Sequence, residues 1–197
     1  LISKLKEEYG EERAQAIFES LLQRNKASIR VTDLSRKEEI KTLLGASDSL
    51  LSPAGLVKEQ GHFASHDLFS EGLITIQDES SQLVAPTLHL QGDEQVLDAC
   101  AAPGGKTVHI ASYLTTGQVT ALDLYDHKLN LIQENAQRLG VADRVQTQKL
   151  DARKVHEFFG KDQFDKILVD APCSGIGLLR RKPDIKYNKD TADFASL

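Results

Sequence analysis

The chain has 197 residues, enough for one well-formed domain or for a domain with a smaller companion. Its formal net charge of −5, with 40% hydrophobic and 27% charged residues, is that of an ordinary globular protein and argues against a uniformly basic nucleic-acid binder. No apolar run is long enough to cross a bilayer and no secretory signal opens the chain, so we expect no membrane partner. Two distant cysteines and six His without a metal-binding pattern predict free thiols, no metal and a cytoplasmic location.

The first half of the chain predicts a helical segment followed by a small α+β subdomain. Apolar residues recur at helical spacing within residues 1–24. The chain starts at Leu1 and contains no Met, so we expect the natural N-terminus to lie upstream. Ser35, with Glu38 at the capping-box position, is predicted to cap a helix over 36–44. The other expected elements are a strand over 27–31, mostly loop over 45–70, a strand over 72–76 and a helix from 77 to about 88.

From residue 95 the pattern changes to a regular alternation of strands and helices. This alternation predicts an α/β fold, a Rossmann-like parallel sheet with helices on both faces. In such sheets the ligand lies outside the carboxyl ends of the strands. Gly140 stands where a helix C-terminus favours glycine. The expected strands are 96–99, 119–123, 145–150 and 166–170, and the expected helices are 106–114, 128–139 and a short one over 153–160.

A loop rich in small residues follows the first of these strands, in the sequence Asp98-Ala-Cys-Ala-Ala-Pro-Gly-Gly-Lys-Thr107. Small residues between a strand and a helix let the backbone approach a ligand closely. A dinucleotide site would need GxGxxG, which the loop lacks. A nucleoside triphosphate site would need GxxxxGK[ST]; Gly105, Lys106 and Thr107 complete that pattern, but Cys100 stands where its first Gly belongs. Pro103 also lacks the amide hydrogen that a phosphate cradle would use. A P-loop-like NTPase stays open as an alternative, because the strand that ends at Asp170 resembles a Walker-B strand.

S-adenosylmethionine is the third cofactor that such a loop could bind, and it needs no phosphate cradle. Asp123 ends the second strand, at the place where an acidic residue meets a ribose in this class of sheet. Asp151 follows the third strand and could accept a hydrogen bond from the adenine amino group. Either residue alone could be a helix cap or a turn residue. Acids at successive strand ends beside one Gly-Gly loop favour the cofactor site.

The fourth strand leads into a second motif, Asp170-Ala-Pro-Cys-Ser-Gly-Ile-Gly177. Carbon-5 of a pyrimidine is too poor a nucleophile to take a methyl group unaided, so a thiolate must first add at carbon-6. A carboxylate near the ring nitrogen can hydrogen-bond or protonate it during this addition. Asp170 and Cys173 suit these two roles. The alternative is that Cys173 is merely a small buried residue.

The two motifs, together with Arg180-Arg-Lys-Pro-Asp-Ile185, resemble the bacterial Sun/Fmu (RsmB) family of ribosomal RNA cytosine-5 methyltransferases. The resemblance implies that one cytosine of small-subunit ribosomal RNA is the substrate. It also implies a cofactor site for S-adenosylmethionine that consists of Cys100, Ala101, Ala102, Pro103, Gly104, Gly105, Lys106, Asp123, Asp151 and Asp170.

The resemblance also changes the role of Cys173. In RNA enzymes of this family the attacking thiol comes from a later Thr-Cys motif, and the cysteine that matches Cys173 assists release of the methylated RNA. The 197 residues contain no Thr-Cys, so the nucleophile is expected beyond them and this fragment by itself is expected to be inactive. A non-catalytic RNA-binding module is a further alternative.

The resemblance suggests three parts. Residues 1–24 would link to an upstream RNA-binding domain, residues 25–90 would form a small RNA-recognition-like subdomain, and residues 91–197 would form the methyltransferase domain. Basic residues beside the Cys173 loop are candidates for contacts with RNA phosphates, against the alternative of a solvated charge run. These residues are Arg180, Arg181 and Lys182. The sequence indicates neither the target cytosine nor an oligomeric state.

Overall fold

The computed structural model describes residues 2–23 and 26–173. The described residues fall into two compact units, with Lys26, Pro172, Cys173 and residues 2–23 in the first and residues 27–171 in the second. The predicted domain boundary at residue 90 falls inside the second unit. Within the described residues no helix is both long and apolar enough to span a membrane.

In the first unit the predicted helical segment is two helices, α1 (Ile2–Tyr9) and α2 (Glu11–Leu22). The break lies at Gly10, whose φ of +78° is a conformation that glycine adopts without strain. Lys6 on α1 and Glu11 on α2 form an ion pair across the break.

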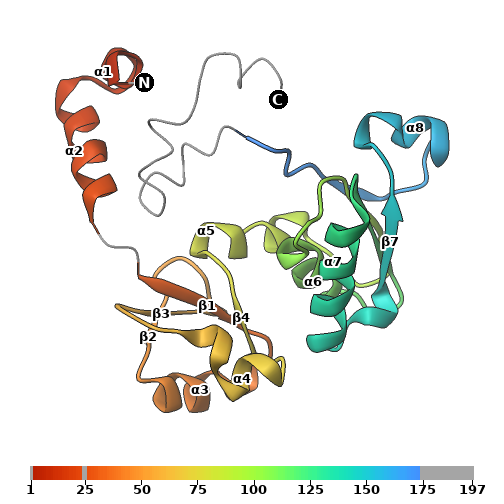
Figure 1. Cartoon of the computed structure of the whole chain (residues 1–197), viewed down its shortest axis with the longest axis horizontal. Helices are drawn as coiled ribbons and strands as arrows, with labels where there is room; N and C mark the ends of the chain where they lie inside the picture. The colour runs from red at the N-terminus through yellow and green to blue at the C-terminus, as the bar shows by residue number, and fades with distance from the viewer. Residues whose placement is uncertain (1, 24–25, 174–197) are drawn as a thin grey trace. The chain divides into compact units, whose positions relative to one another are not determined.

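The second unit begins with a four-stranded antiparallel sheet, sheet A, with strand order β2-β3-β1-β4 (Figure 1). Its apolar face packs against α3 and α4 through a core that includes Ile29, Val31, Ile40, Leu56 and Leu68. The strands are β1 (Ala27–Val31), β2 (Ser47–Asp48), β3 (Gly55–Lys58) and β4 (Ile74–Ile76), and the helices are η1 (Leu34–Arg36), α3 (Lys37–Leu44), η2 (Phe63–Ser65) and α4 (Asp67–Ser70).

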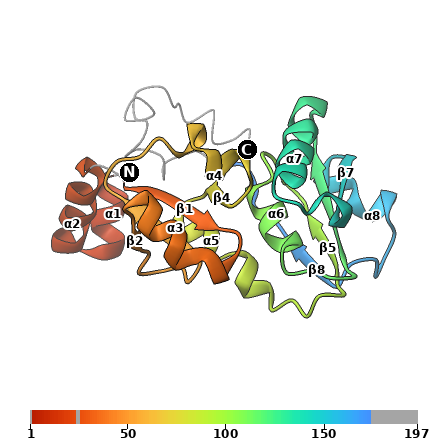
Figure 2. The same ribbon diagram turned by 90° about the horizontal axis from the view of Figure 1, so that it is seen from below.

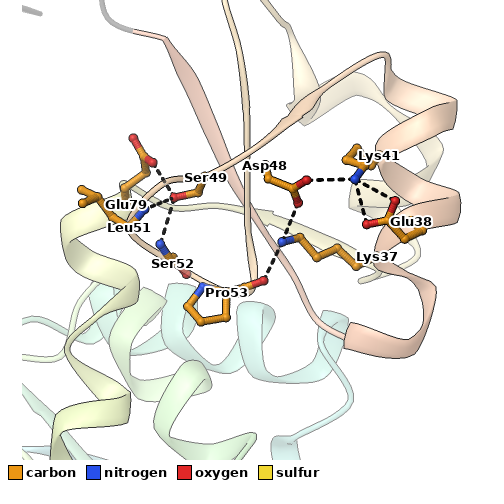
Figure 3. Close-up of polar contacts among 9 residues, drawn as sticks. All are labelled: Lys37, Glu38, Lys41, Asp48, Ser49, Leu51, Ser52, Pro53 and Glu79. Carbon is orange, nitrogen blue, oxygen red and sulfur yellow. Dashed lines mark hydrogen bonds and ion pairs between the residues drawn. The ribbon is translucent and has the colours of Figure 1, made fainter.

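The prediction that 45–70 is mostly loop needs correction, because β2, β3, η2 and α4 lie within this segment. Side chains hold its first part in place, as Figure 3 shows. Asp48 in β2 accepts hydrogen bonds from Lys37 and Lys41 of α3, each at 2.8 Å. These two ammonium groups lower the pKa of Asp48 to about 2. The Ser49 hydroxyl accepts from the amides of Leu51 and Ser52, at 3.1 and 2.9 Å, and closes the turn that leads to β3.

Two helix predictions also need correction. Ser35 does not cap α3; its hydroxyl donates to Asp33, which caps the preceding 3-10 turn by accepting from the Ser35 amide at 2.9 Å. The helix expected over 77–88 is interrupted, since Pro86 has no amide hydrogen to continue an α-helical ladder. The result is α5 (Glu79–Gln82) followed by the 3-10 helix η3 (Ala85–Leu88). We call residues 27–88 the α+β subdomain.

Residues 95–171 form the parallel-sheet domain, and the predicted Rossmann-like architecture is confirmed. Sheet B has strand order β7-β6-β5-β8 with every pairing parallel, and Figure 2 shows β5 beside β8. Helices α6 and α7 bury their apolar side chains against Val96, Val119 and Ala121 of this sheet. The elements are β5 (Gln95–Asp98), α6 (Gly105–Ala111), β6 (Gln118–Asp123), α7 (Asp126–Arg138), η4 (Ala142–Arg144), β7 (Val145–Lys149), η5 (Ala152–Lys154), α8 (Val155–Phe158) and β8 (Lys166–Leu168).

Candidate active site

Each of the four strands of sheet B has an acidic side chain at its carboxyl end or within two residues after it. Read along the order β7-β6-β5-β8, they are Asp151, Asp123, Asp98 and Asp170. Because all strands are parallel, their carboxyl ends share one edge of the sheet. The sequence assigned three of these acids to the cofactor; Asp98, buried at the end of β5, was among the residues expected at the strand ends but was given no role.

The loop between β5 and α6, residues 99–104, is anchored to both neighbouring strands. The Ala99 amide donates to the carbonyl of Leu168 on β8, and the Ala101 amide donates to the carbonyl of Leu122 on β6, each at 2.9 Å. Gly104 has a φ of +98°, and Pro103 follows a cis peptide bond and offers no amide hydrogen. We call residues 99–105 the cofactor loop. Its backbone is thus held between two strands.

Asp98 is a buried carboxylate with an unused oxygen. Its Oδ2 accepts from the Thr107 hydroxyl at 2.7 Å, and its side chain is 99% enclosed, leaving a relative exposure of 1%. The pKa of Asp98 is raised to about 6. Burial is the main cause and the charge of Asp170 adds to it, while the Thr107 hydroxyl, the nearby Cys100 amide and the charge of Lys106 oppose the shift. That amide does not reach hydrogen-bond geometry with Oδ1, which has no partner among the described residues.

Asp123 and Asp151 have different local partners. Asp123 Oδ1 accepts from the Tyr125 amide at 3.2 Å and lies 3.8 Å from Lys128 Nζ, and its side chain is only 11% exposed. Asp151 accepts from the amide of Arg153 at 3.0 Å and from its guanidinium at 2.6 Å. These bonds, the side-chain bond first, lower the pKa of Asp151 to about 2. A ligand amino group would have to share Asp151 with Arg153.

Lys106 and Asp170 join the cofactor loop to the end of β8. Lys106 Nζ donates to Asp170 Oδ2 at 2.7 Å. The sequence predicted both residues for the site but gave no sign that they pair. The pair holds the Asp170 carboxylate beside the first turn of α6, and the carboxylate stays half-exposed, with 52% of its side chain accessible.

Cys100 shows that these acids converge on the cofactor loop. Burial raises the pKa of its thiol, and the charges of all four carboxylates raise it further. Those four are Asp98, Asp123, Asp170 and Asp151. Cys173 is exposed and belongs to the first unit. Arg180, Arg181 and Lys182 lie outside the described residues.

The charge and shape of this edge fit S-adenosylmethionine better than a nucleotide. The four carboxylates outnumber the three cationic side chains that pair with them, so this edge disfavours a triphosphate and attracts a ligand with sulfonium and ammonium groups. The free Oδ1 of Asp98 is a buried acceptor at the loop. A Cβ added at Gly105 would have no other part of the described chain within 4 Å, so a ligand can approach the backbone there. The residues present therefore fit this cofactor.

Comparison with known proteins decides the family. The family model described as 16S rRNA methyltransferase RsmB/F matches residues 85–197. The chain belongs to this family. It is 43% identical over 204 residues to the probable ribosomal RNA small subunit methyltransferase B of Bacillus subtilis (strain 168), an alignment that covers 100% of this chain and 45% of the relative. These matches confirm the methyltransferase family that the two sequence motifs predicted.

Other members give the same picture. Ribosomal RNA small subunit methyltransferase B of Klebsiella pneumoniae subsp. pneumoniae is 43% identical over 129 residues, 66% of this chain and 30% of the relative. A solved methyltransferase homolog protein from Pyrococcus horikoshii is 31% identical, with a TM-score of 0.75, and covers 91% of this chain and 61% of that one. The chain therefore spans less than half the length of these curated relatives. As a member of a methyltransferase family, it has S-adenosylmethionine as its cofactor.

Proposed function

We propose that this chain supplies the cofactor site and part of the base-handling site of an enzyme that methylates carbon-5 of a cytosine in small-subunit ribosomal RNA. The observation that carries the proposal is the acid-lined cofactor loop, joined by the Lys106–Asp170 ion pair to the strand that leads into Pro172 and Cys173. The names of the relatives from Bacillus subtilis and Klebsiella pneumoniae support the ribosomal substrate. Such a substrate suits a cytoplasmic protein.

Each acid of the site has a proposed role toward S-adenosylmethionine, which supplies an electrophilic methyl group. Asp123 accepts hydrogen bonds from the ribose hydroxyls, and Asp151 accepts from the adenine amino group while it stays bonded to Arg153. Residues Cys100 to Lys106 line the rest of the site with their backbone. Asp170, held by Lys106, borders both the cofactor and the base.

Chemistry at carbon-5 needs a thiolate, and the surroundings of the two cysteines separate their roles. A thiolate adds to carbon-6 of the cytosine while Asp170 hydrogen-bonds or protonates the ring nitrogen. After carbon-5 is methylated, a base removes its proton and the thiolate leaves carbon-6. Cys100 is a poor candidate for the attack because burial and four carboxylates oppose its ionisation. In line with the resemblance, we assign the attack to a Thr-Cys motif outside the 197 residues and product release to Cys173.

The target base must leave its RNA stack to reach this site. Arg180, Arg181 and Lys182, which directly follow the Cys173 loop in sequence, remain the proposed contacts to RNA phosphates. Contacts of this kind weaken with salt, so raising the salt concentration should weaken RNA binding and leave cofactor binding almost unchanged.

The cofactor assignment is tested by calorimetric titration of the 197-residue chain with S-adenosylmethionine and with ATP. We expect binding of the former alone, and Asp123→Ala should weaken it about tenfold or more because a charged acceptor is lost. Asp126→Ala is the matched control, since Asp126 is the first residue of α7 and its exposed carboxylate pairs with Lys149 at the end of β7. Binding of ATP alone would favour an NTPase, and RNA binding without either ligand would favour a non-catalytic RNA-binding module.

The role of Cys173 is tested in the full-length gene product with Cys173→Ser. If Cys173 assists release, a covalent complex between protein and RNA should accumulate and survive denaturing electrophoresis. Loss of all adduct would instead make Cys173 the attacking nucleophile and overturn the assignment.

A further inference from the structure

The face of sheet A opposite α3 and α4 is polar and nevertheless buried. Ile29 and Val31 point into the apolar core, so the alternating Ser28 and Arg30 lie on the opposite face. Their exposures are 9% and 2%. This face is covered by α5 and by α6 and α7 of the parallel-sheet domain, which contact it through the hydrogen bonds of Gln82, Gln77 and Arg138. We call this contact the joint. In RNA-recognition modules the same kind of face stacks bases, but here it is occupied within the unit.

From the joint, a first chain of contacts reaches the cofactor loop. Arg30 Nε donates to Gln77 Oε1 at 2.8 Å. A guanidinium has only donors, so the oxygen of the Gln77 amide must face Arg30 and its nitrogen must face away. That nitrogen donates to the carbonyl of Gly105 at 3.3 Å, and also to that of Ser81 at 3.4 Å. Arg30 thus fixes which way Gln77 presents its donor to the end of the cofactor loop.

A second chain of contacts has the same logic and starts from α7. Arg138 lies in the joint, where it donates to the carbonyls of Phe69 and Ile74 at 2.7 and 3.2 Å and stacks 3.9 Å from the centre of the Phe69 ring. It also donates to Asn135 Oδ1 at 3.0 Å. The Asn135 amide nitrogen is thereby turned toward Pro103, in the middle of the cofactor loop, and donates to its carbonyl at 2.9 Å.

We propose that the joint positions the cofactor loop for S-adenosylmethionine through these two arginine–amide relays, with Gln77 and Asn135 as positioning residues. The inference rests on the proposed function, because it takes residues 99–105 to hold the cofactor. Each relay needs an amide. A carboxylate could accept from the arginine, but its second oxygen would face the loop carbonyl and repel it. The α+β subdomain is in this view part of the cofactor site, although it provides no atom that touches the cofactor.

The test uses near-isosteric variants of the 197-residue chain, Gln77→Glu and Asn135→Asp. Each has a matched control that changes a glutamine outside the relays. For Gln77→Glu the control is Gln91→Glu, because the exposed Gln91 side chain donates to the His89 carbonyl and lies between η3 and β5, away from the joint. Gln133→Glu alters α7, two residues before Asn135. For each protein the Kd for S-adenosylmethionine is measured by calorimetry and the melting temperature is measured without ligand.

We expect both relay variants to raise the Kd about three- to tenfold, because each loses one hydrogen bond that holds the cofactor loop in its binding conformation. The controls should keep the Kd of the unchanged chain even where they lower the melting temperature. Equal Kd values in relay variants and unchanged chain would overturn the inference, and so would an equal increase in the controls. Absence of binding by the unchanged chain would overturn the proposed function instead. Should Gln77→Glu fail to fold, the half-exposed Asn135→Asp decides.

Discussion

At the scale of single residues, the two cysteines have opposite surroundings. Cys100 is half-buried among carboxylates that hold its pKa above that of a free thiol, whereas Cys173 is exposed. We expect iodoacetamide to modify Cys173 first and Cys100 slowly, with a pH midpoint for Cys100 above that of a free thiol. Mass spectrometry of peptides over a pH series measures both rates, and Cys173→Ser isolates Cys100. A Cys100 rate equal to that of a free thiol near pH 8 would contradict this description of the loop.

Asp98 gives stability an unusual pH dependence. Its pKa is raised from 3.8 to about 6, so the native protein retains a proton there that the unfolded chain has lost. The contribution of Asp98 to stability is therefore fully present below pH 4 and is lost as the pH rises through 6. Between pH 4 and 7, the unfolding free energy of the wild type should fall by about 2 kcal/mol relative to Asp98→Asn.

Urea denaturation at several pH values measures this difference. Asp48→Asn is the control, because the pKa of Asp48 is lowered to about 2 and its contribution is lost only below this window. The difference between wild type and Asp48→Asn should thus stay nearly flat from pH 4 to 7. A flat difference for Asp98→Asn as well would mean that Asp98 ionises normally.

At the scale of elements, adjacent glycines in the cofactor loop are needed for different reasons. A Cβ on Gly104, where φ is +98°, would lie 3.0 Å from the Ile132 backbone on α7, while a Cβ on Gly105 would meet open space. Gly104→Ala should cost about 1–3 kcal/mol of stability. Gly105→Ala should leave the melting temperature unchanged or higher, since alanine favours the helix, but raise the Kd for S-adenosylmethionine about tenfold by filling the ligand's space. Unchanged binding by Gly105→Ala would place the cofactor elsewhere.

The same elements show how far the sequence could be interpreted. The alternation after residue 95 was predictable because each strand and helix repeats its own period, and parallel strands bring Asp123, Asp151 and Asp170 to one edge whatever the exact boundaries. Strand β2 was missed since its two residues carry no period; Asp48 is held there by Lys37 and Lys41 of the preceding helix.

Contacts between distant parts of the chain left no signal in the sequence. Lys106 pairs with Asp170, 64 residues away, and Gln77 bonds to Gly105, 28 residues away. A local pattern can place a residue at a strand end, but it cannot indicate which distant side chain completes its hydrogen bonds. Asp98 could be expected at a strand end, but its burial and its raised pKa could not, because they depend on the packing around it and on Thr107.

At the scale of the whole molecule, the joint makes the α+β subdomain and the parallel-sheet domain one unit. The polar face of sheet A gains hydrogen bonds from α5 of its own half and from α7 of the other half. Separating the halves would expose Arg30 and Gln77 and break the bond from Gln77 to Gly105. It would also take from Arg138 its carbonyl partners Phe69 and Ile74. Since buried polar groups without partners are costly, the two halves should melt together in a single calorimetric transition.

Gly72 allows the closest backbone approach in this joint. It has a φ of +75°, and a Cβ there would lie 2.0 Å from the Arg138 carbonyl oxygen, so Gly72→Ala must push α7 away from sheet A. Gly140→Ala is the matched control, because Gly140 has a φ of +68° and nothing near its missing Cβ. Both variants place alanine in a left-handed backbone conformation, which lowers the unfolding free energy by about 1–2 kcal/mol, but only Gly72→Ala opens the joint.

We therefore expect Gly72→Ala to melt about 4–8 °C below Gly140→Ala, the shift that about 2 kcal/mol of additional destabilisation produces in a domain of this size. Calorimetry measures the difference. Because both relays begin in the joint, Gly72→Ala should also weaken binding of S-adenosylmethionine, and Gly140→Ala should not. Equal melting temperatures would mean that the joint yields to an added methyl group, and it could then not hold the cofactor loop in place.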